Sequence, residues 1–255
     1  MQELLFRSGV LLLLVALAGC GGSKVLKEPE PFVVTQSLTT ASDQYLSATL
    51  DWVIVRDGPG TWAKNAYWDE YLLTISNQSD LPIQLTNIIV VDSLNTRIAA
   101  QSGRKQLVKE SKKTAKRYKD SGIKVRADAG RGTMGVAIAT AGGVAVGAAA
   151  GAGTIAGAAG GAAVIGAVVL APVLAVGSIV RGVNQSAVNK QIEQRQTLLS
   201  LDVPAGEELM LDVFFPLAPS PGTVELAYSD VTGEHIIVID TSAALDGLHL
   251  ESSVD

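Results

Sequence analysis

Residues 71–91, YLLTISNQSDLPIQLTNIIVV, are the stretch that decides the predicted fold. Its first part places large apolar residues at Tyr71, Leu73 and Ile75, and this period of two predicts a β-strand with one buried face. The polar sequence NQSD that follows predicts a turn, and a second apolar run predicts another strand. The residues of the second run that we expect on its buried face are Ile83, Leu85, Ile89 and Val91.

Similar patterns continue on both sides of this stretch. Upstream, residues 48–55 alternate in the same way and stop at the turn sequence DGPG. Downstream, residues 199–203 and 209–215 predict strands, and residues 224–238 predict a hairpin closed by the turn SDVTG. Short strands with a turn roughly every ten residues are typical of a β-sandwich rather than of an alternating β/α sheet.

The predicted strands fall in two groups that lie far apart in the chain. Neither group has enough strands to close a core, whereas together they reach about seven or eight, a normal number for a sandwich. We therefore predict one discontinuous β-sandwich formed by residues 32–103 and 196–241, with two independent β modules as the alternative. The pairing of NQSDLP upstream with FFPL downstream resembles small periplasmic immunoglobulin-like domains, which implies an immunoglobulin-like sandwich in an α+β chain. Residues 242–255 are polar and acidic and are expected to form a flexible tail.

A strongly basic segment lies inside this acidic chain, whose formal net charge is −5. Residues 104–126 contain ten Lys or Arg against Glu110 and Asp120, a net charge of +8, so the remaining residues carry −13. We predict a basic amphipathic helix over residues 104–127 that lies on anionic lipid headgroups; a solvated linking helix is the alternative. Its less polar face is expected to carry Leu107, Ser111, Ala115 and Tyr118. The residues expected to contact lipid are Lys105, Lys109, Lys112, Lys113, Lys116 and Arg117.

The segment at 130–183 is rich in Gly, Ala and Val and interrupts the predicted sandwich. It contains 49 consecutive residues, 132–180, without a charged side chain. Because one bilayer crossing takes about 20 helical residues, this length predicts two transmembrane helices and a turn near Gly153. Small residues at every fourth position let helix backbones approach closely. The residues expected to pack the two helices are Gly135, Gly143, Gly147, Gly151, Gly153, Gly157 and Gly161.

The same segment contains a weak match to a nucleotide-binding motif, GRGTMG at 130–135. The dinucleotide fingerprint also needs an acidic residue about 20 positions further on, and none lies between Asp128 and Glu193. We therefore expect no nucleotide or other cofactor here.

The N-terminus has the layout of a secretory signal over residues 1–19, with an apolar run that ends in small residues. The sequence LAGC at 17–20 resembles the lipobox of bacterial lipoproteins, which implies that Cys20 is lipidated and that residues 20–31 form a polar tether. Since Gly21 rather than Asp follows the cysteine, the same resemblance implies sorting to the outer membrane.

The repeated GxxxG pattern from 143 to 161 resembles glycine-zipper outer-membrane lipoproteins. A periplasmic basic segment would conflict with the cytoplasmic bias of Lys and Arg in inner-membrane proteins. Both observations favour an outer-membrane protein whose β domain faces the periplasm.

The sequence predicts no catalytic, metal-binding or cofactor-binding residues. Its two histidines, His235 and His249, belong to no metal-ligand spacing, and no nucleophile motif is present. The adjacent acids Asp69 and Glu70 are expected on a solvated strand edge. The three tryptophans, expected to be core or interface residues, are Trp52, Trp62 and Trp68.

These features lead to two functional hypotheses. The first is a non-enzymatic, lipid-anchored cell-envelope protein that acts in envelope structure or in docking a partner. The second is an oligomeric membrane channel or secretion component assembled through the glycines. A hydrolase or carbohydrate-binding module on the sandwich is a third, weaker hypothesis. No nucleic-acid partner is expected.

Overall fold

The computed structural model of the 255-residue chain describes residues 23–29, 32–130 and 185–251. The predicted signal peptide, the lipidation of Cys20 and the seven packing glycines therefore lie outside the described residues. The same holds for the predicted transmembrane hairpin except for its first residue, Gly130. Within the described ranges, no helix is both long enough and apolar enough to cross a bilayer.

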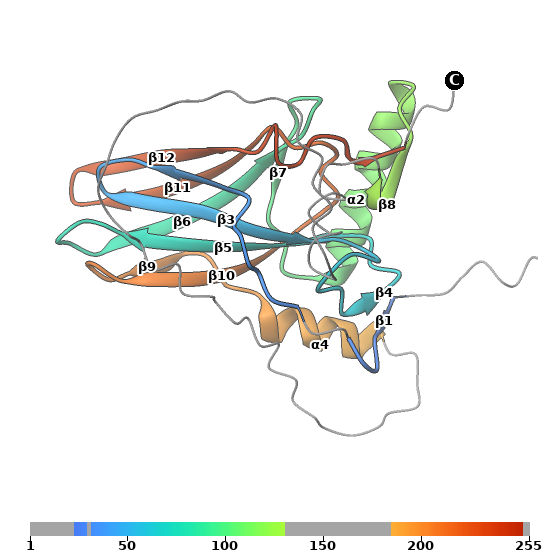
Figure 1. The fold of residues 1–255 in the computed structure, drawn as a ribbon, viewed down its shortest axis with the longest axis horizontal. Coiled ribbons are helices and arrows are strands. Elements are labelled where there is room, and N and C mark those ends of the chain that lie inside the picture. The colour runs from blue at the N-terminus through green and yellow to red at the C-terminus, as the bar shows by residue number, and fades with distance from the viewer. Residues whose placement is uncertain (1–22, 30–31, 131–184, 252–255) are drawn as a thin grey trace, which may run out of the picture.

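Two antiparallel sheets make up most of the described chain (Figure 1). The first has the order β10-β5-β3-β2, and the second has the order β12-β11-β6-β7, with the short β9 also paired to β6. The bounds of the first sheet's strands are β2 Thr39–Ser42, β3 Leu46–Ile54, β5 Asp69–Asn77 and β10 Glu208–Phe215. Those of the second are β6 Ile83–Val91, β7 Arg97–Ala99, β9 Leu201–Val203, β11 Thr223–Asp230 and β12 Gly233–Asp240.

Both sheets contain strands from the two separate parts of the chain. In the first sheet, β10 pairs along the whole of β5, from Glu208 opposite Ser76 to Phe215 opposite Asp69. In the second, β6 pairs with β9 on one side and with β11 on the other. The prediction of one discontinuous sandwich-like fold of the α+β class is confirmed, and the alternative of two independent β modules is wrong.

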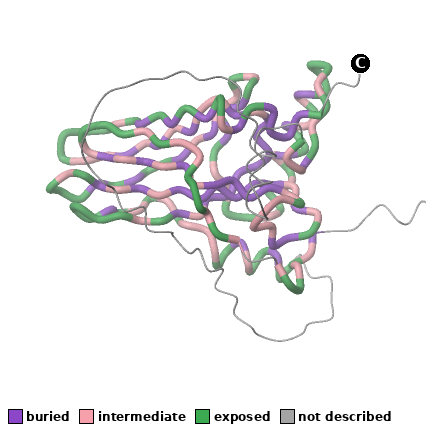
Figure 2. Tube along the Cα trace, viewed as in Figure 1, coloured by how far each residue is buried: buried purple, intermediate pink, exposed green. Residues whose placement is uncertain are grey.

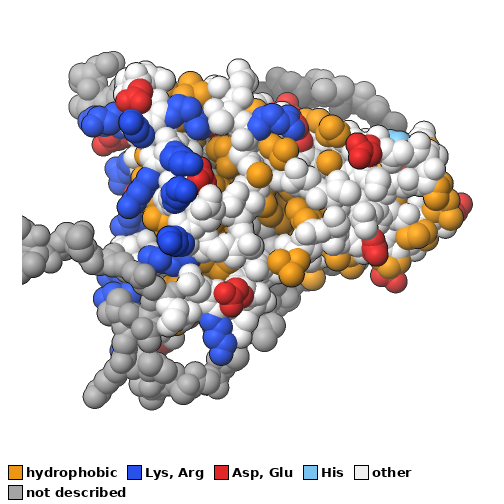
Figure 3. Space-filling model, turned by 180° about the vertical axis from the view of Figure 1, so that it is seen from behind, with side chains coloured by type: hydrophobic (Ala, Val, Ile, Leu, Met, Phe, Trp, Pro, Cys, Tyr) orange, Lys and Arg blue, Asp and Glu red, His pale blue; other side chains and the backbone are white. Residues whose placement is uncertain are grey.

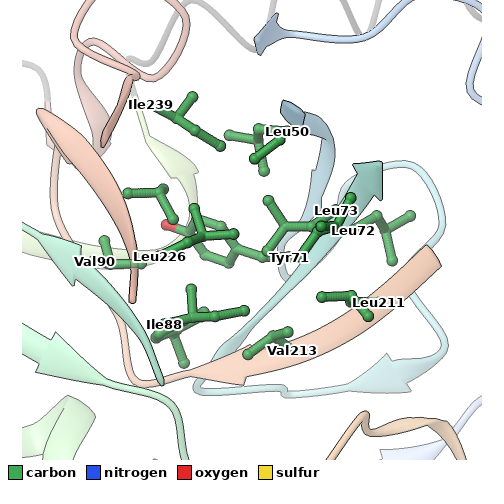
Figure 4. Close-up of a cluster of buried hydrophobic side chains, with 14 of the residues drawn as sticks. Leu50, Tyr71, Leu72, Leu73, Ile88, Val90, Leu211, Val213, Leu226 and Ile239 are labelled. Carbon is green, nitrogen blue, oxygen red and sulfur yellow. The ribbon is translucent and has the colours of Figure 1, made fainter. Parts of the chain in front are cut away.

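The core lies between the two sheets. Figure 4 shows Tyr71 of β5 among aliphatic side chains from both sheets, including Leu50, Val90 and Leu226. The ring of Tyr71 also packs edge-on against Phe215, with ring centroids 4.9 Å apart. Burying each large apolar side chain of this kind contributes about 1.5–3 kcal/mol, so the contact between the sheets is the main source of stability.

One strand differs from its predicted face. The pairing of β6 with β11 skips one residue, because Ala227 lies opposite Asn87 while Tyr228 lies opposite Leu85. This bulge at Thr86 inverts the alternation beyond it. Ile88 and Val90 therefore face the core, and the prediction that Ile89 and Val91 do so is wrong.

The other elements gather at one end of the sandwich (Figure 1). The predicted helix at 104–127 ends at Asp120, and a strand follows it, while the helix α4 was not predicted. The bounds of these elements are β1 Lys24–Val25, β4 Ala63–Lys64, α2 Arg104–Asp120, β8 Val125–Gly130, α4 Gln185–Arg195 and β13 Leu248–Leu250.

Two segments expected to be free are packed instead. Within the predicted tether, β1 pairs with β4, and the Ser23 hydroxyl donates a hydrogen bond to the Asn65 carbonyl at 3.1 Å. Within the predicted tail, Leu245 and Leu248 are fully buried. The expectation of a free tether is therefore wrong for residues 23–25, and that of a flexible tail is wrong for residues 242–251. Polar composition misled both predictions, since a few apolar residues suffice to dock a short segment.

The strand pairings place the connections between strands at two opposite ends of the sandwich. We name each end after the elements that lie there. The loop end consists of the connections at 43–45, 78–82, 204–207 and 231–232, and its tips are exposed (Figure 2). The helical end is the opposite one, where α2, α4 and the four short strands β1, β4, β8 and β13 lie (Figure 1).

Candidate functional site

The helical end is the candidate site because the chain enters, leaves and returns there. It enters at Lys24, which pairs with Lys64 in the connection between β3 and β5. It leaves at Gly130, the last residue of β8, which pairs with Leu248 of β13. It returns at Gln185, the first residue of α4, a helix that packs on β1.

Helix α2 lies across this end (Figure 1). It contains no Gly or Pro, consists largely of strong helix formers, and ends before Gly122, whose φ is +78°. The buried residues recur at spacings of four and three, which places them on one face. They are Leu107, Ser111, Thr114 and Tyr118, so Thr114 is buried where the sequence predicted Ala115.

Polar contacts fix the buried face of α2 on the turns of the sandwich. The Ser111 hydroxyl lies 2.7 Å from the Tyr67 carbonyl and accepts a hydrogen bond from the Leu217 N–H at 3.0 Å. The Tyr118 hydroxyl lies 2.8 Å from that of Ser93. Burial raises the pKa of Tyr118 from its usual 10 to about 12, so this hydroxyl keeps its proton even in moderately alkaline solution.

The opposite face of α2 presents most of the predicted lipid-contacting residues to solvent. Arg117 departs from that prediction, since its guanidinium pairs with the fully buried carboxylate of Asp92. Lys113 is exposed but pairs with Glu110 at 2.8 Å. The remaining four are exposed and make no ion pair with another described residue. They are Lys105, Lys109, Lys112 and Lys116.

Asp69 and Glu70, the first two residues of β5, are buried rather than on a solvated edge, which corrects the prediction. Neighbouring residues of a strand point to opposite faces of the sheet. Asp69 therefore points toward the core side of the sheet and Glu70 toward the side covered by α4. We call these two residues the carboxylate pair.

Asp69 holds the point where the chain leaves the sandwich. Its Oδ2 lies 2.8 Å from Nε2 of His249, and Nδ1 of His249 lies 2.7 Å from the Asp128 carbonyl, two residues before Gly130. Burial raises the pKa of Asp69, and it would lower that of His249, but the Asp69 carboxylate reverses the effect and leaves the His249 pKa raised. Gly130 is required here, because a Cβ would lie 2.5 Å from the Leu250 carbonyl oxygen.

Glu70 holds the point where the chain returns. Its Oε1 accepts a hydrogen bond from Nε of Arg195, the last residue of α4, at 2.7 Å, and its Oε2 accepts one from Nε1 of Trp62 at 2.6 Å. The helix also contributes Val188 and Ile192 to a small apolar cluster. The two described ends of the interrupting segment are thus each hydrogen-bonded through adjacent carboxylates of one strand.

A third acid lies close to the carboxylate pair. Burial, and then the charge of Glu70, raise the pKa of Asp212 in β10 to about 6, against the partial opposing effect of Arg195. Asp212 therefore titrates near physiological pH, and it is an acid of this cluster that the sequence analysis did not single out.

Sequence reasoning missed the carboxylate pair although a signal was present. Two acids stand inside the apolar run YWDEYLL, where charged side chains are rarely buried without partners. Their partners, His249 and Arg195, lie 180 and 125 residues away and could not be assigned by spacing. The predicted role of the tryptophans as core residues is confirmed, since Trp52, Trp62 and Trp68 are all buried.

The described residues contain no group of three His, Cys, Asp or Glu side chains that could hold a metal ion. His235, at the loop end, instead contacts Asp230 and Thr232. Comparison of the chain with models of known families, with curated proteins and with solved structures finds no match.

Proposed function

We propose that this protein is a non-enzymatic, lipid-anchored protein of the bacterial outer membrane whose β domain faces the periplasm. It acts in envelope structure or in docking a partner. The observation that carries the proposal is the meeting of three chain connections at one end of the sandwich, at Lys24, Gly130 and Gln185. A domain attached to a membrane at several points needs those points on one side.

The docking of β1 supports a short attachment. Only three residues separate Cys20 from Lys24, so the two Cα atoms are at most about 14 Å apart. Lipid on Cys20 would therefore hold the helical end beside the membrane. The glycine-rich segment supplies a second attachment in this proposal, as a two-helix transmembrane hairpin packed through its small residues. The finer fold in this proposal is immunoglobulin-like, supported by two packed antiparallel sheets.

Membrane fractionation of the full chain and of Cys20→Ala tests this proposal. We expect the wild-type chain in the outer-membrane fraction, with a mature N-terminal Cys20 whose mass includes lipid. Cys20→Ala should lose the lipid and remain uncleaved by the lipoprotein signal peptidase. A wild-type chain recovered in the periplasmic extract, or a mature chain without lipid, would contradict the proposal.

The spacing of the glycines favours a second candidate, an oligomeric membrane channel or secretion component. Glycines at every fourth position can join helices of different copies as well as two helices of one copy. The mass of the particle extracted in mild detergent separates the candidates, since a channel requires several copies. Gly147→Leu with Gly157→Leu should dissociate such an assembly, whereas a monomeric wild-type particle would exclude it.

A further inference from the structure

Charge is divided between the two ends of the sandwich. The four connections of the loop end contain Asp43, Asp80 and Glu207 and no Lys or Arg. The strand ends beside them add further acids. Figure 3, seen from behind, shows Lys and Arg gathered over the helical end among a few acidic side chains, whereas the visible part of the loop end shows acidic side chains and no Lys or Arg. These strand-end acids are Asp202, Glu208, Asp230 and Glu234.

Four lysines form one line along the exposed face of α2. Lys105, Lys109, Lys112 and Lys116 follow each other at spacings of four, three and four residues, which places them on one side of a helix. The line is about 17 Å long at the helical rise of 1.5 Å per residue. We call these four residues the lysine line. It lies opposite the buried face of α2 and therefore points away from the sandwich.

The acids at the helical end leave this positive charge largely uncompensated. Six of them already pair with a basic residue that is not in the lysine line, and the exposed Asp120, four residues after Lys116, lies near one end of the line. These pairs are Asp57 with Arg56, Glu70 with Arg195, Asp92 with Arg117, Glu110 with Lys113, Asp128 with Arg126 and Glu251 with Lys124.

We propose that the lysine line docks the helical end on a surface of anionic phospholipid headgroups, so that the sandwich stands upright with its loop end directed away from the membrane. This inference rests on the proposed membrane attachment and adds the lipid class and the orientation. Charge complementarity selects the partner, and the position of the chain connections at the same end selects a membrane over a free polyanion.

The dimensions make the upright orientation measurable. Strands β3 and β5 each have nine residues, so the loop end lies about 30 Å from the helical end. This separation is several Debye lengths at physiological salt, where the screening length is about 8 Å. The acidic loop end is therefore screened from the membrane when the helical end touches it, and it would be repelled if it approached.

The test uses single labels on the full lipidated chain. Cys20 is the only cysteine and its thiol is blocked by lipid, so Lys119→Cys provides a unique site on α2, three residues beyond the lysine line and on the same side of the helix. Val231→Cys provides the matched site at the loop end, where Val231 is 78% exposed. Each chain is reconstituted in vesicles of phosphatidylcholine alone or with phosphatidylglycerol, and fluorescence quenching by a headgroup-attached quencher is measured.

We expect the label at position 119 to be quenched more strongly with phosphatidylglycerol than with phosphatidylcholine alone, and about 1 M salt to abolish this difference. The label at position 231 should stay unquenched in both lipids. Converting the lysine line to Gln should shift the docking equilibrium by at least about 100-fold, since each such charge contributes roughly fivefold near an anionic membrane. A matched variant at the loop end, Asp80→Asn with Asp202→Asn, Glu207→Gln and Glu208→Gln, should leave the quenching at 119 unchanged.

Three results would overturn the inference. The first is equal quenching of the two labels, and the second is quenching at 119 that is independent of phosphatidylglycerol. The third is a change in the fluorescence of the 119 label on addition of inorganic polyphosphate, in a chain that does not dock on anionic vesicles. This result would assign the lysine line to a soluble polyanion. A chain whose mass shows no lipid on Cys20 would refute the anchor instead, and the labels in a Cys20→Ala background would still report the orientation.

Discussion

The helical end and the loop end of this sandwich are held together by different kinds of interaction. At the helical end, buried charged groups join segments far apart in sequence, as Asp69 does with His249 and Glu70 with Arg195. At the loop end, the central residue is a neutral amide. Nδ2 of the buried Asn77 lies 2.8 to 3.0 Å from the carbonyls of Leu81, Val203 and Pro204.

This difference matters because the two kinds of interaction respond differently to solution conditions. A buried charged pair depends on pH, and removing one partner leaves the other charge buried and uncompensated. An amide that bonds backbone carbonyls has no titration and leaves only neutral groups unpaired. The buried charged pairs at the end that the proposal places at the membrane therefore make a pH-dependent contribution to stability, whereas the contribution of Asn77 at the loop end does not depend on pH.

The largest effect is expected from Asp69→Ala. The change leaves His249 fully buried without its carboxylate, and loss of one partner from a buried pair typically costs about 3–5 kcal/mol. The free energy of unfolding, measured with denaturant, should fall by this amount. The exposed acid Asp80 at the loop end provides the control, since Asp80→Ala should change the stability by less than about 0.5 kcal/mol. Equal effects of the two variants would show that the Asp69–His249 pair is not stabilising.

A smaller loss is expected from Asn77→Ala at the loop end. Each lost hydrogen bond contributes about 1 kcal/mol, and several backbone carbonyls lose a partner together, so the total is about 2–3 kcal/mol. Unlike the loss in Asp69→Ala, this loss should be the same at pH 5 and pH 8. A loss that varies with pH would show that the hydrogen bonds of Asn77 are coupled to a titrating group.

The sequence predicted the regular parts of this fold better than its connections between distant segments. The strands around Leu73, Leu211 and Leu226 were predicted because alternation is a local property of the chain. The bulge at Thr86 was missed, since one inserted residue has no composition signal of its own. The helix α4 was missed because its apolar residues, Val188 and Ile192, are few and are buried only by distant partners.

The same difference between local and distant interactions decides which parts of the candidate site could be predicted. The helix α2 and the basic residues on its exposed face could be predicted, because charge and helical spacing can be read locally, while their contact with lipid stays a prediction. The burial of Asp69 and Glu70 could not be read in this manner. Whether an acid at the start of a strand is solvated depends on what covers it, and here α4 and β13 do so from positions more than 100 residues away.

The smallest expected effect, and the only stabilising one, concerns Asp212 beside Glu70. Its pKa of about 6 in the folded chain exceeds its usual value of 3.8, so the folded state binds this proton more tightly than the unfolded state does. The contribution to stability is then complete below pH 3.8 and is lost as the pH rises through about 6. Asp212→Asn removes the charge whose burial is unfavourable, and at pH 8 it should raise the free energy of unfolding by about 1–2 kcal/mol. At pH 4 the two chains should have nearly equal free energies of unfolding, because the wild-type carboxyl is protonated when folded.

Unfolding curves at both pH values measure the difference. Asp202→Asn, which changes an exposed acid of the loop end, is the matched control and should show no such pH dependence. If Asp212→Asn instead destabilises the protein at pH 8, its carboxylate is held by Arg195 rather than opposed by Glu70, and a third negative charge would be tolerated beside the carboxylate pair.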